Sequence, residues 1–172
     1  MPNTALLIVD AQNEMYDQAN PVHQSDQLLA NLKLIIQKAR SADVPVIYVQ
    51  HNDAGLVKGT DFWQIHEAIQ PETGDTVVQK WTPDSFHETT LLNELKNKAI
   101  QHLVIAGNQT EYCIDATTRS ANKHGFTITL AKDAHGTWDS ETMSAAQIID
   151  HHNEMLSSVA ELQETKDIEF SK

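Results

Sequence analysis

The most constraining feature of this sequence is a set of short, continuous apolar runs that alternate with segments of helical periodicity. The runs occupy residues 5–9, 45–49, 77–80, 103–106 and 127–131. Strands that are apolar on both faces are typical of a parallel sheet covered by helices. Apolar residues recur at helical spacing in residues 25–39, 91–99, 112–124 and 141–156. The pattern predicts a single α/β domain over residues 1–172, with three α/β/α layers and a mostly parallel central sheet.

The ends of these elements carry their own signals. Ser25 and Ser140 are placed as N-caps of the first and last helices, and Gly125 is placed as a C-terminal stop. The irregular stretch 52–74 is long for a compact domain, and we expect it to border a functional site. The charged tail, residues 161–172, is expected to be loosely held.

Composition excludes several classes of partner. The 172 residues include 12 basic and 24 acidic side chains, and the net charge of −12 argues against nucleic acid or an anionic membrane as partner. One cysteine excludes an internal disulfide and is compatible with a reducing compartment. No apolar stretch approaches a signal sequence or a membrane span. These features predict a cytoplasmic protein that acts on a small molecule.

Three polar side chains follow apolar runs. Asp10, Lys80 and Cys113 come at or just after the ends of predicted strands, so a parallel sheet brings all three to the same edge. A thiolate could attack there, an ammonium could hold it, and a carboxylate could move the proton. Each residue also has an ordinary interpretation: a turn-capping aspartate, a solvated lysine and a buried structural cysteine.

The position of Cys113 suggests how the thiol is activated. The apolar run 103–106 ends at Gly107, and helical periodicity begins near Tyr112. Backbone N–H groups at the start of a helix are unpaired and partly positive, which lowers the pKa of a thiol and can hold an oxyanion. The sequence therefore predicts a thiol with a lowered pKa at a strand-to-helix junction.

These segments resemble the isochorismatase-like cysteine hydrolases, the family that includes nicotinamidase and N-carbamoylsarcosine amidohydrolase. The resemblance rests on Leu-Ile-Val-Asp10, on Lys80-Trp-Thr-Pro-Asp-Ser-Phe, and on Gly-Asn-Gln-Thr-Glu-Tyr-Cys113, and it spans about residues 4–155. It implies that Cys113 is the nucleophile, Asp10 the general acid/base and Lys80 the cationic partner of the thiolate. It also implies a cis peptide between Asn108 and Gln109, with the N–H groups of Gln109 and Cys113 forming an oxyanion hole.

The resemblance is weaker for a cofactor. Nicotinamidase relatives carry an Asp-x-His metal segment, whereas this chain has His51-Asn52-Asp53, and His66 is the only other histidine before Lys80. His51, Asp53 and His66 could bind zinc or manganese, but their order differs from the family pattern. The sequence therefore predicts no metal and no other cofactor. Family resemblance alone implies a homo-oligomer, either a dimer or a tetramer.

Pocket residues are proposed from their positions on loops near the strand ends, since aromatic-lined clefts with a few polar groups are typical of small-ligand sites. The candidates are Gln12, Trp63, His66, Trp81, Phe86, Tyr112 and Trp138. Core packing is an equally good interpretation of each. His151 and His152 on the last helix are unusual as neighbours, and they fit either a subunit contact or a solvated helix face.

The leading hypothesis is a metal-independent cysteine hydrolase that cleaves a C–N bond of a small amide, carbamoyl compound or lactam through a thioester acyl-enzyme. Relatives that cleave the vinyl ether of isochorismate lack the cysteine, so Cys113 favours C–N chemistry. A thiol redox enzyme using Cys113, an isochorismatase-type ether hydrolase and a non-catalytic binding protein remain as alternatives.

Overall fold

A computed structural model of the chain describes residues 3–171 and shows one six-stranded sheet in the order β3-β2-β1-β4-β5-β6. All five neighbouring pairs in this sheet are parallel. The strands are β1 (Thr4–Val9), β2 (Val46–His51), β3 (Thr76–Lys80), β4 (His102–Asn108), β5 (Thr127–Gly136) and β6 (Glu161–Gln163). The predicted α/β architecture with a parallel central sheet is confirmed.

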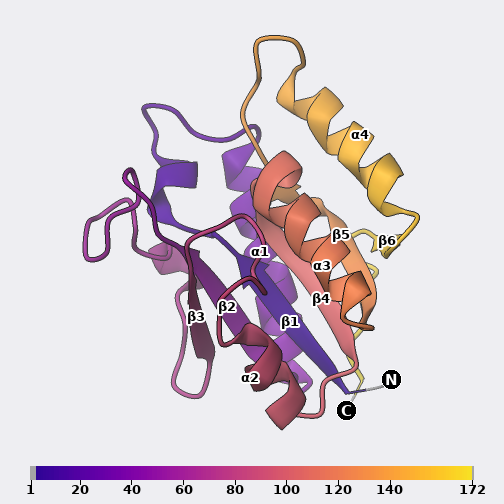
Figure 1. The fold of residues 1–172 in the computed structure, drawn as a ribbon. Helices are drawn as coiled ribbons and strands as arrows, with labels where there is room; N and C mark the ends of the chain where they lie inside the picture. Colours follow the sequence, from indigo (N-terminus) through magenta and orange to yellow (C-terminus); the bar gives the residue numbers. More distant parts are fainter. Residues whose placement is uncertain (1–2, 172) are drawn as a thin grey trace.

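Helices cover both faces of the sheet (Figure 1). They are α1 (Ser25–Ser41), α2 (Leu91–Asn97), α3 (Asp115–Lys123) and α4 (Ala145–Leu156). In Figure 1, α1 lies behind the sheet, α2 and α3 lie in front, and α4 lies beside α3. Short helical turns are η1 (Asn13–Tyr16), η2 (Glu67–Ile69) and η3 (Thr110–Ile114). Across residues 3–171, no helix is both long and apolar enough to cross a membrane.

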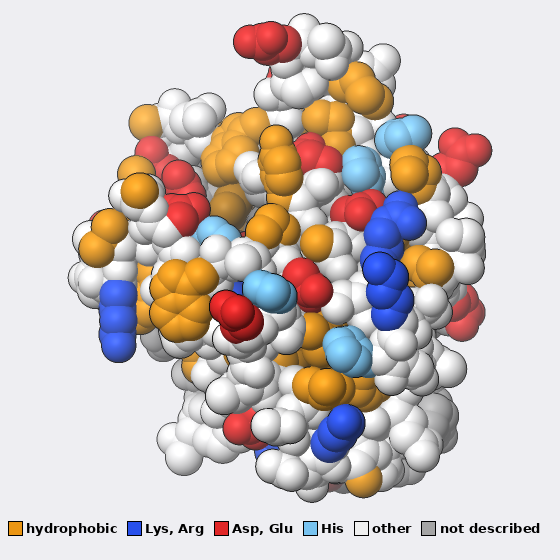
Figure 2. All heavy atoms as spheres, in the orientation of Figure 1, with side chains coloured by type: hydrophobic (Ala, Val, Ile, Leu, Met, Phe, Trp, Pro, Cys, Tyr) orange, Lys and Arg blue, Asp and Glu red, His pale blue; other side chains and the backbone are white. Residues whose placement is uncertain are grey.

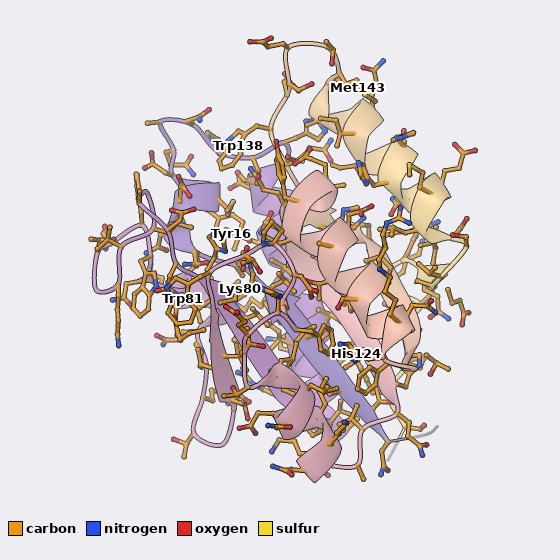
Figure 3. The ribbon with its side chains drawn as sticks, in the orientation of Figure 1. Tyr16, Lys80, Trp81, His124, Trp138 and Met143 are labelled. Carbon is orange, nitrogen blue, oxygen red and sulfur yellow. The ribbon has the colours of Figure 1, made fainter. Side chains whose placement is uncertain are left out.

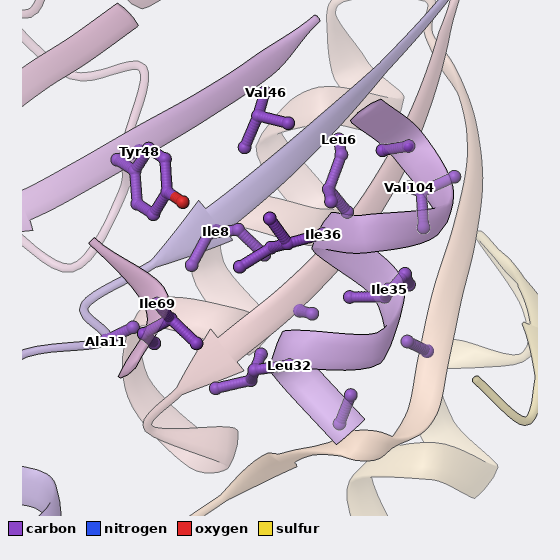
Figure 4. Close-up of a cluster of buried hydrophobic side chains, with 14 of the residues drawn as sticks. Leu6, Ile8, Ala11, Leu32, Ile35, Ile36, Val46, Tyr48, Ile69 and Val104 are labelled. Atoms are coloured by element: carbon purple, nitrogen blue, oxygen red, sulfur yellow. The ribbon is translucent and has the colours of Figure 1, made fainter. Parts of the chain in front are cut away.

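The sheet separates two hydrophobic clusters. The α1 cluster joins Leu32, Ile35 and Ile36 of the helix to Leu6 and Ile8 of β1, all at most 2 % exposed (Figure 4). The second cluster packs α2 and α3 against the alternate residues of the same strands. Burying one Leu or Ile side chain contributes roughly 1.5–3 kcal/mol, so the two clusters hold the strands in place on both faces of the sheet.

The close approach of β1 and β4 depends on a glycine. Gly107 pairs with Val9 in the parallel register and has φ of +127°. A Cβ atom at this position would overlap the backbone carbonyl of Val9, so no other residue fits without moving the strands. This glycine therefore sets the spacing between the strand that ends at Asp10 and the strand that leads to Cys113.

Two predicted helix boundaries need correction. Gln24, in a left-handed conformation, is the N-cap of α1, and Ser25 is its first helical residue. The last helix starts at Ala145 because Ser144 forms a capping box with Gln147, while Ser140 instead bonds to Met143 in the preceding turn. Local spacing could not distinguish the two serines.

The C-terminal tail is also more ordered than predicted. Residues 161–163 form the edge strand β6, which pairs with Thr129, Leu130 and Ala131 of β5. Beyond it, Thr165 donates its backbone N–H and its hydroxyl to Asp133 Oδ1, both at 2.7 Å. Ile168 is 2 % exposed and joins the α1 cluster. These apolar and polar contacts anchor a segment that its charge predicted to be loosely held. The terminal residue, 172, lies outside the described residues.

Candidate functional site

Asp10, Lys80 and Cys113 meet at the carboxyl edge of the sheet, as the strand pattern predicts. Lys80 Nζ lies 3.0 Å from Asp10 Oδ2 and 3.0 Å from Cys113 Sγ. All three side chains are buried, with Lys80 fully enclosed and Cys113 the most open at 7 % exposure. Figure 3 shows Lys80 at this edge, between Trp81 and the loop that carries Trp138. A thiol, a carboxylate and an ammonium therefore form one contact group.

The backbone places these side chains. Asp10 follows β1 directly, adopts φ of +49° and donates its N–H to Val49 O at 2.9 Å. A left-handed conformation is uncommon for a non-glycine residue and turns the chain sharply at the strand end. Lys80 is the last residue of β3 and pairs in register with His51, the last residue of β2. Adjacent strand ends thus bring these side chains to one point.

Cys113 sits on a different turn from the one predicted. Residues 110–114 form a π-helical turn, and the regular helix α3 begins only at Asp115. The cis peptide between Asn108 and Gln109, implied by the family resemblance, is present just before this turn. Single π-helical turns are rare and occur often at functional sites.

The electrostatics reverse one prediction. Burial, with the negative charge of Asp10 beside it, raises the pKa of the Cys113 thiol to about 12, and the Lys80 ammonium offsets only part of this. Burial also raises the pKa of Asp10, against the opposing effect of Lys80. The expected lowering of the thiol pKa by the helix start does not occur, because the thiol is buried against a carboxylate. In the resting protein the sulfur is therefore protonated.

One negative charge in the group is favoured by the contacts, because the single Lys80 cation lies beside both the carboxylate and the thiol. With Cys113 as a thiol, Asp10 is the anion that balances Lys80. If the proton moves from Sγ to Asp10, the sulfur becomes the anion, and Lys80 is already 3.0 Å from it. The total charge of the buried group does not change, so the transfer avoids the large cost of creating a new buried charge. Lys80 can stabilise either state without moving.

His51 extends this group toward solvent. Its Nδ1 lies 2.6 Å from Lys80 Nζ, and its Nε2 lies 3.1 Å from Asp53 Oδ2. Because an ammonium can only donate, Nδ1 accepts from Lys80 and Nε2 carries the proton that is donated to Asp53. We call Asp10, Lys80, Cys113, His51 and Asp53 the charged network. His51 ends its strand at the same edge as Lys80, which is the signal that sequence reasoning could have used.

A second network holds the opposite side of the nucleophile turn. Thr110 Oγ1 lies 2.8 Å from His135 Nδ1, and His135 Nε2 lies 2.8 Å from Asn153 Oδ1. Asn153 Nδ2 donates to Lys132 O at 3.1 Å, which fixes its Oδ1 as the acceptor. His135 is therefore protonated at Nε2 and accepts from Thr110 at Nδ1. We call Thr110, His135 and Asn153 the neutral network.

Burial keeps this histidine uncharged. His135 is 3 % exposed, and desolvation, only partly offset by its bond to Asn153, lowers its pKa to about 4. The histidine lies near the end of β5, which extends to Gly136, five residues beyond its predicted end. In this extension the pairing of β5 with β4 shifts register between Ile105 and Gly107. No periodic pattern in the sequence indicates this extension, so the position of His135 could not be predicted.

A cavity of about 380 Å³ opens onto the charged network. It is lined by Asp10, His51 and Cys113, together with Gln109 from the predicted oxyanion hole. The predicted pocket residues Trp81, Tyr112 and Trp138 also line it. Trp81 and Tyr112 are 64 % and 58 % exposed, and the Trp138 indole donates to Asn20 O at 2.8 Å. Three aromatic side chains therefore surround the approach to Cys113.

The other four predicted pocket residues lie outside this lining. Gln12 is fully buried because its amide bonds to the backbone of His51 and Trp63. The Trp63 indole donates to Asn52 Oδ1, which buries it within the 52–74 loop. His66 Nδ1 accepts from Ala68 N and its ring contacts Tyr16.

Phe86 is the fourth correction. It packs against Phe126 and His124 within the second hydrophobic cluster. In all four cases a partner in the tertiary structure decides which way the side chain points, and spacing along the chain does not encode that partner.

The candidate metal ligands are not assembled as a set. His51 and Asp53 are in contact, but His66 is engaged with Ala68 and Tyr16. Asp10, His51 and Cys113 do place one potential ligand atom each within 4.8 Å of one another. However, the Lys80 ammonium contacts all three, and a divalent cation there would face this positive charge at close range. These residues do not fit a metal ion.

His151 and His152 have separate environments. Their rings meet edge to face at 5.5 Å between centroids. His152 Nδ1 lies 2.9 Å from Asp115 Oδ2, whereas His151 is exposed. Both line a second cavity beside the one at Cys113, and the exposure of His151 is compatible with a subunit contact as well as with a solvated helix face.

The isochorismatase domain family matches residues 4–165, almost the whole chain. The chain belongs to the isochorismatase family. Its fold agrees closely with the crystal structure of an isochorismatase family protein, with a TM-score of 0.90 and 32% identity, covering 95% of this chain and 99% of that one. The resemblance inferred from the three motifs is thereby confirmed, and the protein is a hydrolase of the isochorismatase family.

Curated relatives of this isochorismatase-family chain include an uncharacterized family protein, YddQ, from Bacillus subtilis. It is 33% identical over 140 residues, which are 78% of each chain. Nicotinamidase 3 from Arabidopsis thaliana is 30% identical over 158 residues, which cover 82% of this chain and 77% of that protein. The family is thus shared with a protein named for an amidase activity.

Proposed function

We propose that this protein hydrolyses a C–N bond of a small amide, carbamoyl compound or lactam through a thioester formed on Cys113. The observation that carries the proposal is the contact of one buried ammonium with both a carboxylate and a thiol, at 3.0 Å each. The amidase activity named for the Arabidopsis relative supports the same bond type.

The first half of the reaction forms the acyl-enzyme. Asp10 takes the proton from Cys113, and the thiolate attacks the carbonyl carbon of the substrate. The N–H groups of Gln109 and Cys113 are proposed to hold the oxyanion of the tetrahedral intermediate. As the intermediate collapses, the C–N bond breaks and the protonated Asp10 gives its proton to the leaving nitrogen. A thioester and a free amine or ammonia result.

The second half regenerates the protein. A water molecule enters where the amine left, and Asp10 takes one of its protons as the oxygen attacks the thioester. The C–S bond then breaks, and the proton returns from Asp10 to the sulfur. Lys80 contacts both groups throughout, so the negative charge alternates between carboxylate and thiolate beside a fixed cation.

Thiol redox chemistry is less well supported. Sulfenic acid formation favours an accessible thiolate of low pKa, whereas Cys113 is 7 % exposed and its pKa is raised to about 12. It is also the single cysteine of the sequence, so the chain holds no resolving thiol. A pure binding role leaves the buried Asp10–Lys80–Cys113 group without a purpose.

The test is amine or ammonia release from a panel of small amides, ureides and cyclic amides. The wild type and Cys113→Ala are compared with and without a chelator, and intact-protein mass spectrometry follows the acyl-enzyme. We expect the wild type to release amine or ammonia and to carry an acyl adduct. This release should be lost in Cys113→Ala and should be unaffected by the chelator. Release that persists in Cys113→Ala would contradict the mechanism, and loss in chelator would require a metal.

A further inference from the structure

The charges around the catalytic cavity are one-sided. The lining includes the carboxylates of Asp10 and Asp53, which belong to the charged network, and that of Glu14, which does not. The charge of Asp53 acts on Glu14. No Lys or Arg side chain lines this cavity anywhere in residues 3–171. The ammonium of Lys80 is fully buried and already has four partners within the protein. A ligand that enters the cavity therefore meets negative charge and no available cation.

Glu14 is the least satisfied of these groups. No hydrogen bond or ion pair involves its carboxylate within the described part of the chain. Partial burial and the charge of Asp53 raise the pKa of Glu14, as expected for two carboxylates without a shared cation. In contrast, Asp53 accepts from the N–H groups of Gly55 and Leu56 and from His51. Glu14 is thus the carboxylate that a cationic ligand would pair with.

A second observation points to a hydrogen-bond donor on the ligand. Asp10 Oδ1 is buried, lines the same cavity and has no hydrogen-bond partner among residues 3–171 apart from the neighbouring Cys113 thiol. A thiol is a weak donor, so a ligand N–H would satisfy this buried carboxylate oxygen better. The interior end of the cavity therefore favours an N–H group, and the Glu14 side favours a positive charge.

The adjoining cavity has the same character. It measures about 690 Å³ and shares Gln109, Tyr112 and Trp138 with the catalytic cavity. The carboxylates in its lining are those of Glu111, Asp139 and Glu141, and no Lys or Arg belongs to the described lining. Figure 2 shows hydrophobic, acidic and His side chains around this part of the surface, with a column of Lys and Arg side chains next to them on the right.

We propose that the substrate is a small amide that carries an ammonium or guanidinium group, and that Glu14 pairs with this cation beside the rings of Tyr112 and Trp138. The inference rests on the proposed function for the reacting amide. Aromatic faces and carboxylates both attract cations, and their effects add in a partly desolvated cavity. A substrate carboxylate would be repelled by Glu14 and Asp53 and would find no cation to bind.

The turnover experiment uses amides with one scissile bond and three tails of similar size, ending in an ammonium, a hydroxyl or a carboxylate. The ammonium substrate is expected to have a kcat/KM about tenfold or more above the hydroxyl substrate, with the carboxylate last. Glu14→Gln should lower kcat/KM for the ammonium substrate about fivefold more than for the hydroxyl substrate, so that the preference between the two tails shrinks. Glu154→Gln, on the exposed part of α4 outside both cavities, is the matched control and should change neither.

A binding experiment separates this inference from the reaction. Cys113→Ala is titrated with benzylammonium, benzyl alcohol and benzoate, and binding is followed by tryptophan fluorescence, since Trp81 and Trp138 line the cavity. Benzylammonium should bind most tightly, and adding Glu14→Gln should remove its advantage. If this holds while the wild type releases no amine, the cation site stands and the proposed hydrolysis fails.

The opposite results would overturn the cation site. If all three substrates are hydrolysed with equal kcat/KM, the proposed function is supported and the cation site is contradicted. Benzylammonium affinity that is unchanged by Glu14→Gln would also contradict the cation site.

Discussion

The two networks that flank Cys113 hold it in different ways. The charged network on the β1–β3 side contains buried ions in contact, and its proton and negative charge can move between Asp10 and Cys113. The neutral network on the β5–α4 side has one fixed tautomer, and the pKa of His135 is lowered to about 4. The protein thus confines mobile charge to one side of the nucleophile and keeps the other side neutral. In the proposed reaction the charged network transfers the proton, and the neutral network positions the turn that carries Cys113.

The largest effect is expected from removing the cation of the charged network. Lys80→Met leaves the buried Asp10 without its ion pair, which should lower the free energy of unfolding by about 3–5 kcal/mol. Turnover should also fall about 10³-fold or more, because neither anion of the reaction keeps its counter-ion. Chemical denaturation and steady-state kinetics measure both quantities. A variant as stable as the wild type would show that Lys80 does not balance a buried charge.

The neutral network predicts a smaller effect with a distinct pH dependence. The folded pKa of His135, about 4, lies below the unfolded value of 6.5. Between these values the unfolded chain binds a proton that the folded protein does not, so stability is lost as pH falls from 6.5 toward 4. The loss amounts to about 3 kcal/mol over this window.

His135→Gln is the variant that isolates this term. At pH 7 it should be about 1–3 kcal/mol less stable than the wild type, because the bonds to Thr110 and Asn153 are weakened. Its deficit should shrink as the pH approaches 4, since glutamine does not titrate. Denaturant midpoints measured at pH 7, 5.5 and 4.5 give the comparison. A deficit that stays constant would mean that the pKa of His135 is the same in the folded protein as in the unfolded chain.

His51 tests the outer end of the charged network, where the smallest effect is expected. His51→Ala removes one of four acceptors of Lys80 and leaves its contacts with Asp10 and Cys113 in place. We expect kcat to fall about tenfold, a difference of about 1.4 kcal/mol, with KM little changed. His51→Gln, which keeps an acceptor, should recover part of the rate. A loss as large as that of Lys80→Met would make His51 part of the reacting group.

Much of the scaffold could be predicted because it follows from local pattern. The apolar runs that end at Asp10 and Lys80 predict strands, and the parallel arrangement then brings their ends together with Cys113. The family motifs add the cis peptide before Gln109, which the structure contains. These features depend on residue type and order, which the sequence shows directly.

The missing parts depend on contacts between distant segments. Gln12 was expected in the pocket, yet it is used to tie the end of β1 to the backbone of β2 and the 52–74 loop. His135 follows an irregular part of β5, and its role appears only once Thr110 and Asn153 are brought to it. The high pKa of Cys113 has the same origin, because burial beside Asp10 outweighs the effect of the turn on which it sits.

The most direct test of this account measures the thiol and the reaction in the same variant, Asp10→Asn. Burial still raises the pKa of Cys113 in this variant, but the negative charge of Asp10 no longer adds to it, while Lys80 remains beside the sulfur. Alkylation of Cys113 by iodoacetamide at pH 7 should therefore be faster than in the wild type. Amide turnover should nevertheless fall about 10²–10⁴-fold, since no group moves the proton. Slower alkylation, or turnover that survives, would contradict the claim that Asp10 keeps the resting thiol protonated and then acts as its base.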